Sequence, residues 1–226
     1  MSEGLACDDL VKALHRTLNA LPDDRKGKDT QYAITDAALG ACAVFFTQSP
    51  SFLAYQRTMQ QAKGRSNAES LFGVATIPCA NQIRTRLDPV DPGQLFPVFQ
   101  VVYQALDRAG LVAACRAFAG QLLMARDGTE YFSSPQMCGA PCSQRAHRQG
   151  GVTYFHHVIT PVIVAPGKAE VITLEPAFIT PPDGQQKQDC EQVAAKRWTE
   201  RHAGHYPDAT ILGDDLYCKQ PFCELL

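Results

Sequence analysis

The hydrophobic pattern of the chain changes near residue 120, and this change constrains the fold more than any other feature. Before it, apolar residues recur at helical spacing, as in the leucine series from Leu5 to Leu18, which ends at Pro22. After it, segments rich in β-branched and aromatic residues are separated by turn signals. We therefore expect an α+β protein with a helical region at residues 1–120 and a second domain at residues 121–226.

Each region has an expected order of elements. In the first we expect buried and amphipathic helices at residues 37–46, 52–63, 80–87 and 94–109. In the second we expect strands at residues 121–132, 152–164, 170–179 and 209–212, with a helix at residues 189–202. The second region is therefore predicted to be a βββαβ unit.

Two aspartates stand at the ends of the first and fourth predicted strands. Asp127 interrupts an apolar strand, and a buried carboxylate is costly there unless it is paired, hydrogen-bonded or bound to a metal. Asp214 follows a short apolar strand in the same way. If the two strands are neighbours, both carboxylates meet at one edge of the sheet, where Mg²⁺ or Mn²⁺ would offset their repulsion. The alternative is that each aspartate lies in an ordinary polar turn, since Asp-Gly is a common turn pair.

Several short segments carry a family resemblance, and they occur in order over most of the chain. They are residues 48–57 (QSPSFLAYQR), 71–73, 77–88, 127–134 (DGTEYFSS), 138–147, 154–156, 187–197 and 213–217 (GDDLY). Together they resemble the DDE transposases of bacterial insertion sequences, which have an RNase H-like catalytic core. The resemblance implies that Asp127 and Asp214 are the first and second catalytic acids. It also implies metal-dependent phosphodiester hydrolysis and strand transfer, with the element's terminal inverted repeats and target DNA as partners.

The resemblance is incomplete at one important position. The family has a third acid, usually Glu, on a helix beyond a fifth strand, and Glu224 follows Asp214 too closely to be that residue. We therefore expect the amino-terminal part of a transposase, inactive alone unless the missing part is supplied in trans. A homo-oligomer or a mixed assembly with full-length transposase is possible on this view. The fourth strand is expected to have an open, aggregation-prone edge.

A second set of residues has the chemistry of a zinc site. Cys138, Cys142 and His147 fall between the first two predicted strands, and His156 lies within the second. Two thiolates and two imidazoles complete a tetrahedral structural Zn²⁺ site. The alternatives are a loop of free thiols, or a rival function in which the chain is a non-catalytic, zinc-stapled DNA-binding or regulatory module.

Positive charge gathers at residues 57–86, where five cations face one glutamate, a local charge of +4. Within this segment Arg57, Arg84 and Arg86 are the candidates for phosphate or groove contacts. Near the catalytic core the corresponding candidates for DNA-backbone contacts are Lys187, Lys196 and Arg197. The family resemblance favours DNA contact, and the alternative is a solvated helix face.

Composition limits the location of the chain. The net charge is −2, and no apolar run approaches the ~20 residues that span a bilayer. The first residues lack a basic segment followed by an apolar one, so we expect a cytoplasmic protein without membrane contact. The nine cysteines are an odd number, which favours reduced thiols over a disulfide framework.

Overall fold

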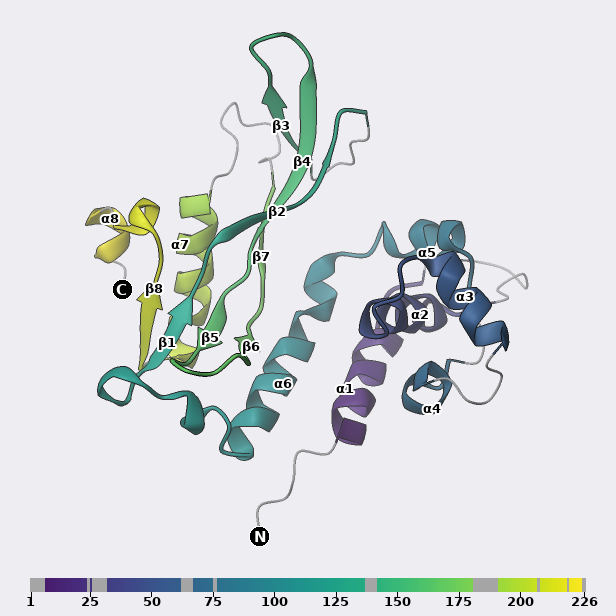
Figure 1. Ribbon diagram of the computed structural model, residues 1–226, viewed down its shortest axis with the longest axis horizontal. Helices are drawn as coiled ribbons and strands as arrows, with labels where there is room; N and C mark the ends of the chain where they lie inside the picture. Colours follow the sequence, from purple (N-terminus) through teal and green to yellow (C-terminus); the bar gives the residue numbers. More distant parts are fainter. Residues whose placement is uncertain are drawn as a thin grey trace. The chain divides into compact units, whose positions relative to one another are not determined.

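The computed structural model describes residues 7–23, 25, 32–61, 67–74, 77–136, 142–180, 191–206, 208–218 and 220–224. The chain divides into two compact units, Met1–Ala105 and Leu106–Leu226. The described part of the first unit is helical, and that of the second combines sheets with helices (Figure 1). The predicted α+β class is therefore confirmed, and the division between the units falls within a helix rather than at residue 120.

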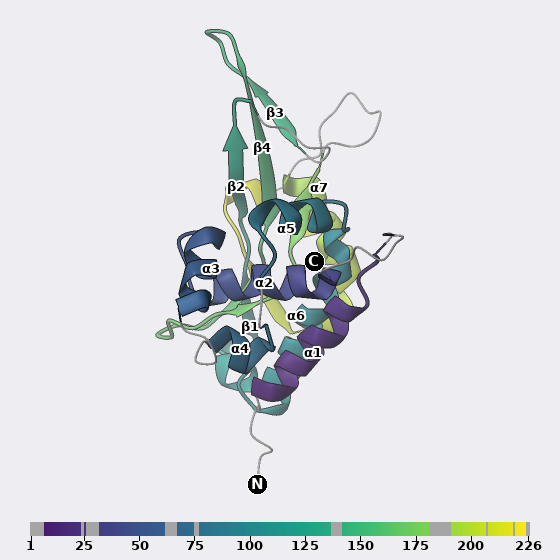
Figure 2. The same cartoon turned by 90° about the vertical axis from the view of Figure 1, so that its right-hand side faces the viewer.

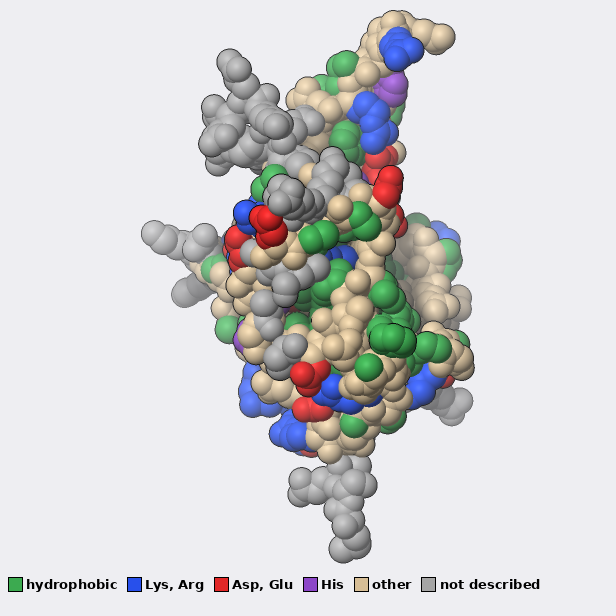
Figure 3. Space-filling view, turned by 90° about the vertical axis from the view of Figure 1, so that its left-hand side faces the viewer, with side chains coloured by type: hydrophobic (Ala, Val, Ile, Leu, Met, Phe, Trp, Pro, Cys, Tyr) green, Lys and Arg blue, Asp and Glu red, His purple; other side chains and the backbone are tan. Residues whose placement is uncertain are grey.

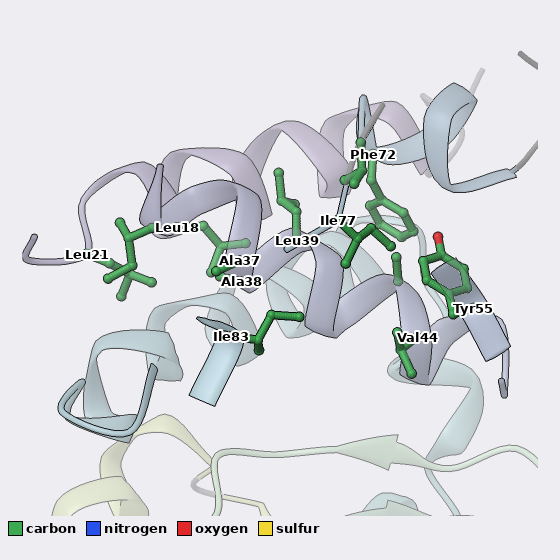
Figure 4. Packing of buried hydrophobic residues seen from close by; sticks show 13 residues of the cluster. Leu18, Leu21, Ala37, Ala38, Leu39, Val44, Tyr55, Phe72, Ile77 and Ile83 are labelled. Atoms are coloured by element: carbon green, nitrogen blue, oxygen red, sulfur yellow. The ribbon is translucent and has the colours of Figure 1, made fainter. Parts of the chain in front are cut away.

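The first unit is built around one apolar helix. Its elements are α1 (Cys7–Asn19), α2 (Ile34–Phe46), α3 (Phe52–Gln61), α4 (Asn67–Phe72), α5 (Ala80–Leu87), the 3₁₀ turn η1 (Pro92–Leu95) and the start of α6 (Phe96–Arg108). Helix α2 contacts α1, α3, α4 and α5 because its residues after Thr35 and Asp36 in the first turn are all nonpolar. Figure 4 shows Ala37, Leu39 and Val44 of α2 among side chains from the surrounding helices and loops, including Leu18 and Ile83.

The second unit contains eight described strands and a long helix. The strands are β1 (Leu122–Ala125), β2 (Gly128–Ser134), β3 (Ser143–Ala146), β4 (Val152–Ile159), β5 (Val162–Val164), β6 (Ile172–Thr173), β7 (Ala177–Ile179) and β8 (Ala209–Leu212). Helix α7 (Glu191–His202) precedes β8. The short helical elements are η2 (Ala113–Cys115), η3 (Phe118–Gly120), η4 (Ala203–His205), η5 (Asp215–Tyr217) and α8 (Gln220–Cys223).

The first three predicted strands are present, each divided into two pieces. The antiparallel register that pairs Ala125 with Val162 continues without a shift to the pair Gly128 and Ile159. Strands β1 and β2 therefore form one interrupted strand, and β4 and β5 form its antiparallel partner. Pro161 lies at the second interruption, where it cannot donate a ladder hydrogen bond. Strands β6 and β7 then pair with β5 and β4 as the third strand.

The last strand, β8, lies parallel to β1 and forms the edge of the sheet ordered β6-β5-β1-β8. Parallel neighbours need a crossover connection, and α7 supplies it. Ala194 and Ala195 of α7 are fully buried against Ile159 and Ile179, so small side chains let the helix lie close to the sheet. The α7 side chain of Trp198 also donates a hydrogen bond to the Glu175 carbonyl at 2.7 Å.

One strand was not predicted. Strand β3 pairs with the first half of β4, and the two extend as a hairpin beyond the rest of the strands of this unit (Figures 1 and 2). Gly150 and Gly151 form its tip with φ angles of 90° and 92°, which side-chain-bearing residues rarely adopt. The β3 sequence, Ser-Gln-Arg-Ala, is polar, so its strand form depends on pairing with β4.

Among the helices that the structure describes, none combines the length and the hydropathy needed to cross a bilayer.

Candidate functional site

The parallel pairing of β1 with β8 brings the segments that carry Asp127 and Asp214 to the same edge of the sheet. Each aspartate stands two residues beyond a strand end, and those ends, Ala125 and Leu212, are direct partners in the ladder. The backbone N–H of Arg126 still donates to the Leu212 carbonyl at 3.1 Å. Neighbouring strands lie about 4.8 Å apart, so two residues that are distant in the sequence leave the sheet side by side.

Both aspartates also take part in local turns. The Asp127 Oδ1 atom accepts a hydrogen bond from the Gly128 N–H at 2.8 Å. The Asp214 carbonyl accepts one from the Tyr217 N–H at 3.2 Å, which closes the turn η5. Both side chains are exposed. The turns therefore hold the backbone of each aspartate, and the carboxylates remain accessible from solvent.

A third carboxylate, which the sequence analysis did not single out, lies against the Asp127-Gly128 turn. A Cβ atom placed on Gly128 would lie 2.3 Å from Glu191 Oε2, so the glycine makes room for this carboxylate. The Tyr217 hydroxyl donates a hydrogen bond to Glu191 Oε1 at 2.5 Å. Glu191 thus connects the turn after β1 with the turn after β8. No spacing rule marks it, because its approach depends on where α7 crosses the sheet.

The tyrosine that binds Glu191 is held in its neutral form. Burial, followed by the hydrogen bond and the charge of Glu191, raises the pKa of Tyr217 far above its ordinary value. Asp127 contributes in the same direction, whereas the positive charge of Arg126 acts against it. The neutral phenol can therefore donate to Glu191 throughout the physiological pH range.

Arg126 is a buried cation beneath this cluster. Its side chain is 3% exposed, and Nη1 donates to Thr199 Oγ1 at 2.7 Å. The guanidinium carbon lies 5.2 Å from the ring centroid of Tyr217 and 4.5 Å from that of Phe222. Within the described residues, Nε and Nη2 have no hydrogen-bond partner. Burial lowers the pKa of Arg126 to about 10, so it stays charged at neutral pH.

The structure brings together two of the four residues of the predicted zinc site. Cys142 Sγ lies 2.9 Å from His156 Nε2, because Ser143 pairs with Phe155 and the preceding residue therefore faces His156. His147 lies five residues further along the hairpin, about 16 Å away, and its Nε2 atom is within 2.7 Å of Thr153 Oγ1. Cys138 is outside the described residues.

A tyrosine completes the surroundings of His156. The Tyr131 hydroxyl lies 3.2 Å from Nδ1, the ring nitrogen that faces away from Cys142. Tyr131 is the extra residue of a β-bulge, since Glu130 pairs with His157 and Phe132 with His156. Within the described part of the chain, no three His, Cys, Asp or Glu side chains are close enough to form a complete metal site.

The predicted DNA-contacting residues differ in whether their side chains are exposed or already bind another part of the protein. Arg57 and Arg84 are exposed on α3 and α5. Arg86 instead binds its own unit, since Nη1 donates to the Tyr32 carbonyl and the guanidinium carbon lies 5.8 Å from the Tyr32 ring centroid. An internal role for Arg86 is thus sufficient to explain its position.

On α7, Lys196 and Arg197 are both exposed. Lys196 lies 4.0 Å from Glu200, and Arg197 donates to the Phe178 carbonyl at 3.2 Å. Lys187 is outside the described residues. The structure thus leaves these two α7 cations at the surface, each with a neighbour on the protein.

The β3–β4 hairpin adds a basic surface that the sequence analysis missed. Residues 131–169 contain no Asp or Glu, whereas Arg145 and Arg148 lie on the hairpin and its turn. Lys, Arg and His side chains are visible along this projection at the top of Figure 3. Arg145 packs over the Phe155 ring at 4.6 Å and pairs with Glu130 at 3.0 Å. The sequence feature that could have predicted this basic surface is the long segment without Asp or Glu, residues 131–169.

Comparisons of the chain with family models, curated proteins and solved structures return no match.

Proposed function

We propose that this chain acts in DNA transposition and that its second unit is an RNase H-like core of the DDE type. The observation that carries the proposal is the in-register parallel pairing of β1 with β8, which aligns Asp127 and Asp214 at one sheet edge. The order of the strands, three antiparallel followed by a helix and a parallel edge strand, is the order that the resemblance implies.

The residues at this edge fit a hard divalent cation. Asp127 and Asp214 would hold Mg²⁺ or Mn²⁺, because carboxylate oxygens are the ligands these ions prefer. With such ions bound, the site would gain a Lewis acid that activates a water or a 3′-hydroxyl for attack on a phosphodiester. Glu191 and Tyr217 would hold the two turns at a fixed separation through their hydrogen bond.

The chain is proposed to bind metal and DNA. Glu191 lies before β8, whereas the family pattern places its third acid after that strand. Glu191 is therefore not proposed as the third acid of this pattern. Terminal inverted repeats and target DNA are the proposed nucleic-acid partners.

Manganese binding tests the metal proposal directly. We expect the wild-type chain to bind Mn²⁺, measured by the loss of the free-ion signal in electron paramagnetic resonance. Asp127→Asn and Asp214→Asn should each weaken binding at least about tenfold, the effect of about 1.4 kcal/mol. Asp215→Asn is the matched control, because this exposed neighbour begins η5 and should leave binding unchanged. Equal binding by all three variants would refute the proposal.

Binding to duplexes that contain the flanking inverted repeats tests the DNA proposal. Arg57 and Arg84, together with Lys196, Arg197 and the hairpin arginines, supply exposed positive charge, so affinity should fall steeply with salt. Salt-independent binding, or none at low salt, would contradict a DNA-contacting role.

The second candidate function is a zinc-stapled DNA-binding or regulatory module without strand chemistry. The contact between Cys142 and His156 favours it. DNA binding that persists in Asp127→Ala, with no Mn²⁺-dependent nicking by wild type, would favour this candidate. Nicking that is abolished by Asp127→Asn or Asp214→Asn would favour the first.

A further inference from the structure

We infer that Cys142 and His156 are two ligands of a structural zinc site, and that Tyr131 positions His156 from outside the ligand shell. The inference is independent of the metal centre proposed at Asp127 and Asp214. It also changes the ligand set expected from the sequence, because it excludes His147.

The distance between the two side chains suits a shared cation. A Zn–S bond of about 2.3 Å and a Zn–N bond of about 2.0–2.1 Å at a tetrahedral angle place sulfur and nitrogen about 3.6 Å apart. Cys142 Sγ and His156 Nε2 are 2.9 Å apart. A movement of less than about 1 Å between them would admit the ion, with no change in strand register. The backbone therefore already presents both ligands to one point.

The chemistry of the pair selects a soft or borderline ion. A thiolate with an imidazole favours Zn²⁺ over Mg²⁺ or Ca²⁺, which prefer oxygen ligands. Cys142 is 4% exposed. The rings of Tyr131 and Phe132 lie 5.5 Å and 5.2 Å from the His156 ring, so they cover part of this imidazole, although Tyr131 itself is 52% exposed. The burial of the Cys142 thiol strengthens the attraction between a cation and its thiolate.

Tyr131 supplies the outer contact that a metal-binding histidine normally has. A ligating imidazole usually hydrogen-bonds through its other nitrogen, which fixes the tautomer and the direction of the ring. The Tyr131 hydroxyl is 3.2 Å from His156 Nδ1 and can accept that hydrogen bond. The β-bulge explains the direction of the Tyr131 side chain, because a bulge adds one residue to the strand and changes the direction in which its side chain points. The phenol, the imidazole and the thiol thus form a line from β2 across β4 to Cys142.

The role of the site follows from its position. His156 belongs to the central strand β4, whereas Cys142 immediately precedes β3. A shared ion would fix the start of β3 on β4 and so set the register of the projecting hairpin. His147 lies at the other end of β3, near the hairpin turn, where it contacts Thr153.

Metal analysis of the full chain tests the inference. We expect wild type to carry zinc, measured by inductively coupled plasma mass spectrometry. Replacement by Co²⁺ should produce thiolate-to-cobalt charge-transfer absorption. Cys142→Ser should abolish that absorption, and His156→Asn should weaken Co²⁺ binding at least about tenfold. His147→Asn and Cys79→Ser, both at exposed positions, are the matched controls and should leave the absorption and affinity unchanged.

The positioning role of Tyr131 has its own readout. Tyr131→Phe keeps the ring and removes the hydroxyl, so we expect about a 10–100-fold loss of Co²⁺ affinity with the charge-transfer band retained. An unchanged affinity would overturn the role of Tyr131.

Three results would overturn the site itself. They are the absence of thiolate absorption in wild type, its persistence in Cys142→Ser, and equal losses of affinity in His147→Asn and His156→Asn. Circular dichroism verifies the folding of each variant. If Cys142→Ser does not fold, the Co²⁺ affinities of His156→Asn and His147→Asn still show whether His156 is a ligand. Asp127→Asn should keep its zinc, which separates this test from that of the proposed function.

Discussion

Replacing Gly128 by alanine should destabilise the second unit, although the backbone at this position suits an alanine. Gly128 does not have a positive φ angle, and a strand alanine is favoured over glycine by about 0.5–1 kcal/mol. The new Cβ would, however, lie 2.3 Å from Oε2 and 2.7 Å from Cδ of Glu191. Because Tyr217 is 5% exposed, moving Glu191 would leave a buried hydroxyl without its acceptor.

The size of the destabilisation follows from the loss of the hydrogen bond between Tyr217 and Glu191. A buried hydroxyl without a partner costs about 1–3 kcal/mol, which exceeds the gain from the glycine-to-alanine change. We therefore expect Gly128→Ala to lower the free energy of unfolding by about 0.5–2 kcal/mol. Urea unfolding followed by tryptophan fluorescence measures it. Trp198, the single tryptophan, is buried in α7, so its emission reports the second unit.

A double-mutant cycle separates this clash from other effects. Glu191→Ala removes the two nearest atoms that the new Cβ would meet, although it also leaves Tyr217 without its acceptor. The third atom, His157 Nε2 at 2.9 Å, remains, but it is the far end of a side chain that can shift. In that background Gly128→Ala should be neutral or stabilising by up to about 1 kcal/mol. The coupling energy is then about 1–3 kcal/mol. Costs that add to within about 0.5 kcal/mol, or a Gly128→Ala variant as stable as wild type, would refute the packing described for this turn.

Four further predictions use the same unfolding assay or a binding assay. The pKa of Tyr217 is raised above its ordinary value of 10.0, so the unfolded state loses this proton first and the unfolding free energy should fall as pH rises above 10. Tyr217→Phe should lack this part of the alkaline decline, and an unchanged pH profile would be evidence against a raised pKa. Arg126→Met should raise the unfolding free energy by about 1–2 kcal/mol, because it removes a buried charge with two unpartnered nitrogens among the described residues. A loss of stability instead would show that the ring contacts of Arg126 outweigh its burial. Arg84→Ala should weaken DNA binding and reduce its salt slope by about 0.9, measured by fluorescence anisotropy at several salt concentrations. Arg86→Ala should mainly destabilise the first unit, because Arg86 binds Tyr32 within that unit. An Arg86→Ala variant that folds and loses more DNA affinity than Arg84→Ala would contradict this structural role.

Patterns that repeat over a few residues were readable from the sequence. The helix predicted at residues 80–87 is α5, and the strand predicted at residues 209–212 is β8. The strand predicted at residues 152–164 is present as β4 and β5, divided beside Pro161. These assignments succeed because side-chain periodicity and the missing N–H of proline act locally. The positions of Asp127 and Asp214 after strands were predictable for the same reason.

Contacts between distant residues required the tertiary structure. Strand β3 has a polar sequence and forms because β4 is available to pair with it. The register of that pair, which no residue spacing specifies, puts His156 beside Cys142 and carries His147 away from them. In the same way, Glu191 reaches Gly128 only because α7 crosses the sheet where it does. The sequence by itself determined the helices and strands that have a clear hydrophobic pattern, and it identified Asp127, Asp214, Cys142 and His156 as residues that could perform chemistry. Which of those residues meet was decided by strand register and helix packing, since both are set by the burial of side chains from the whole unit.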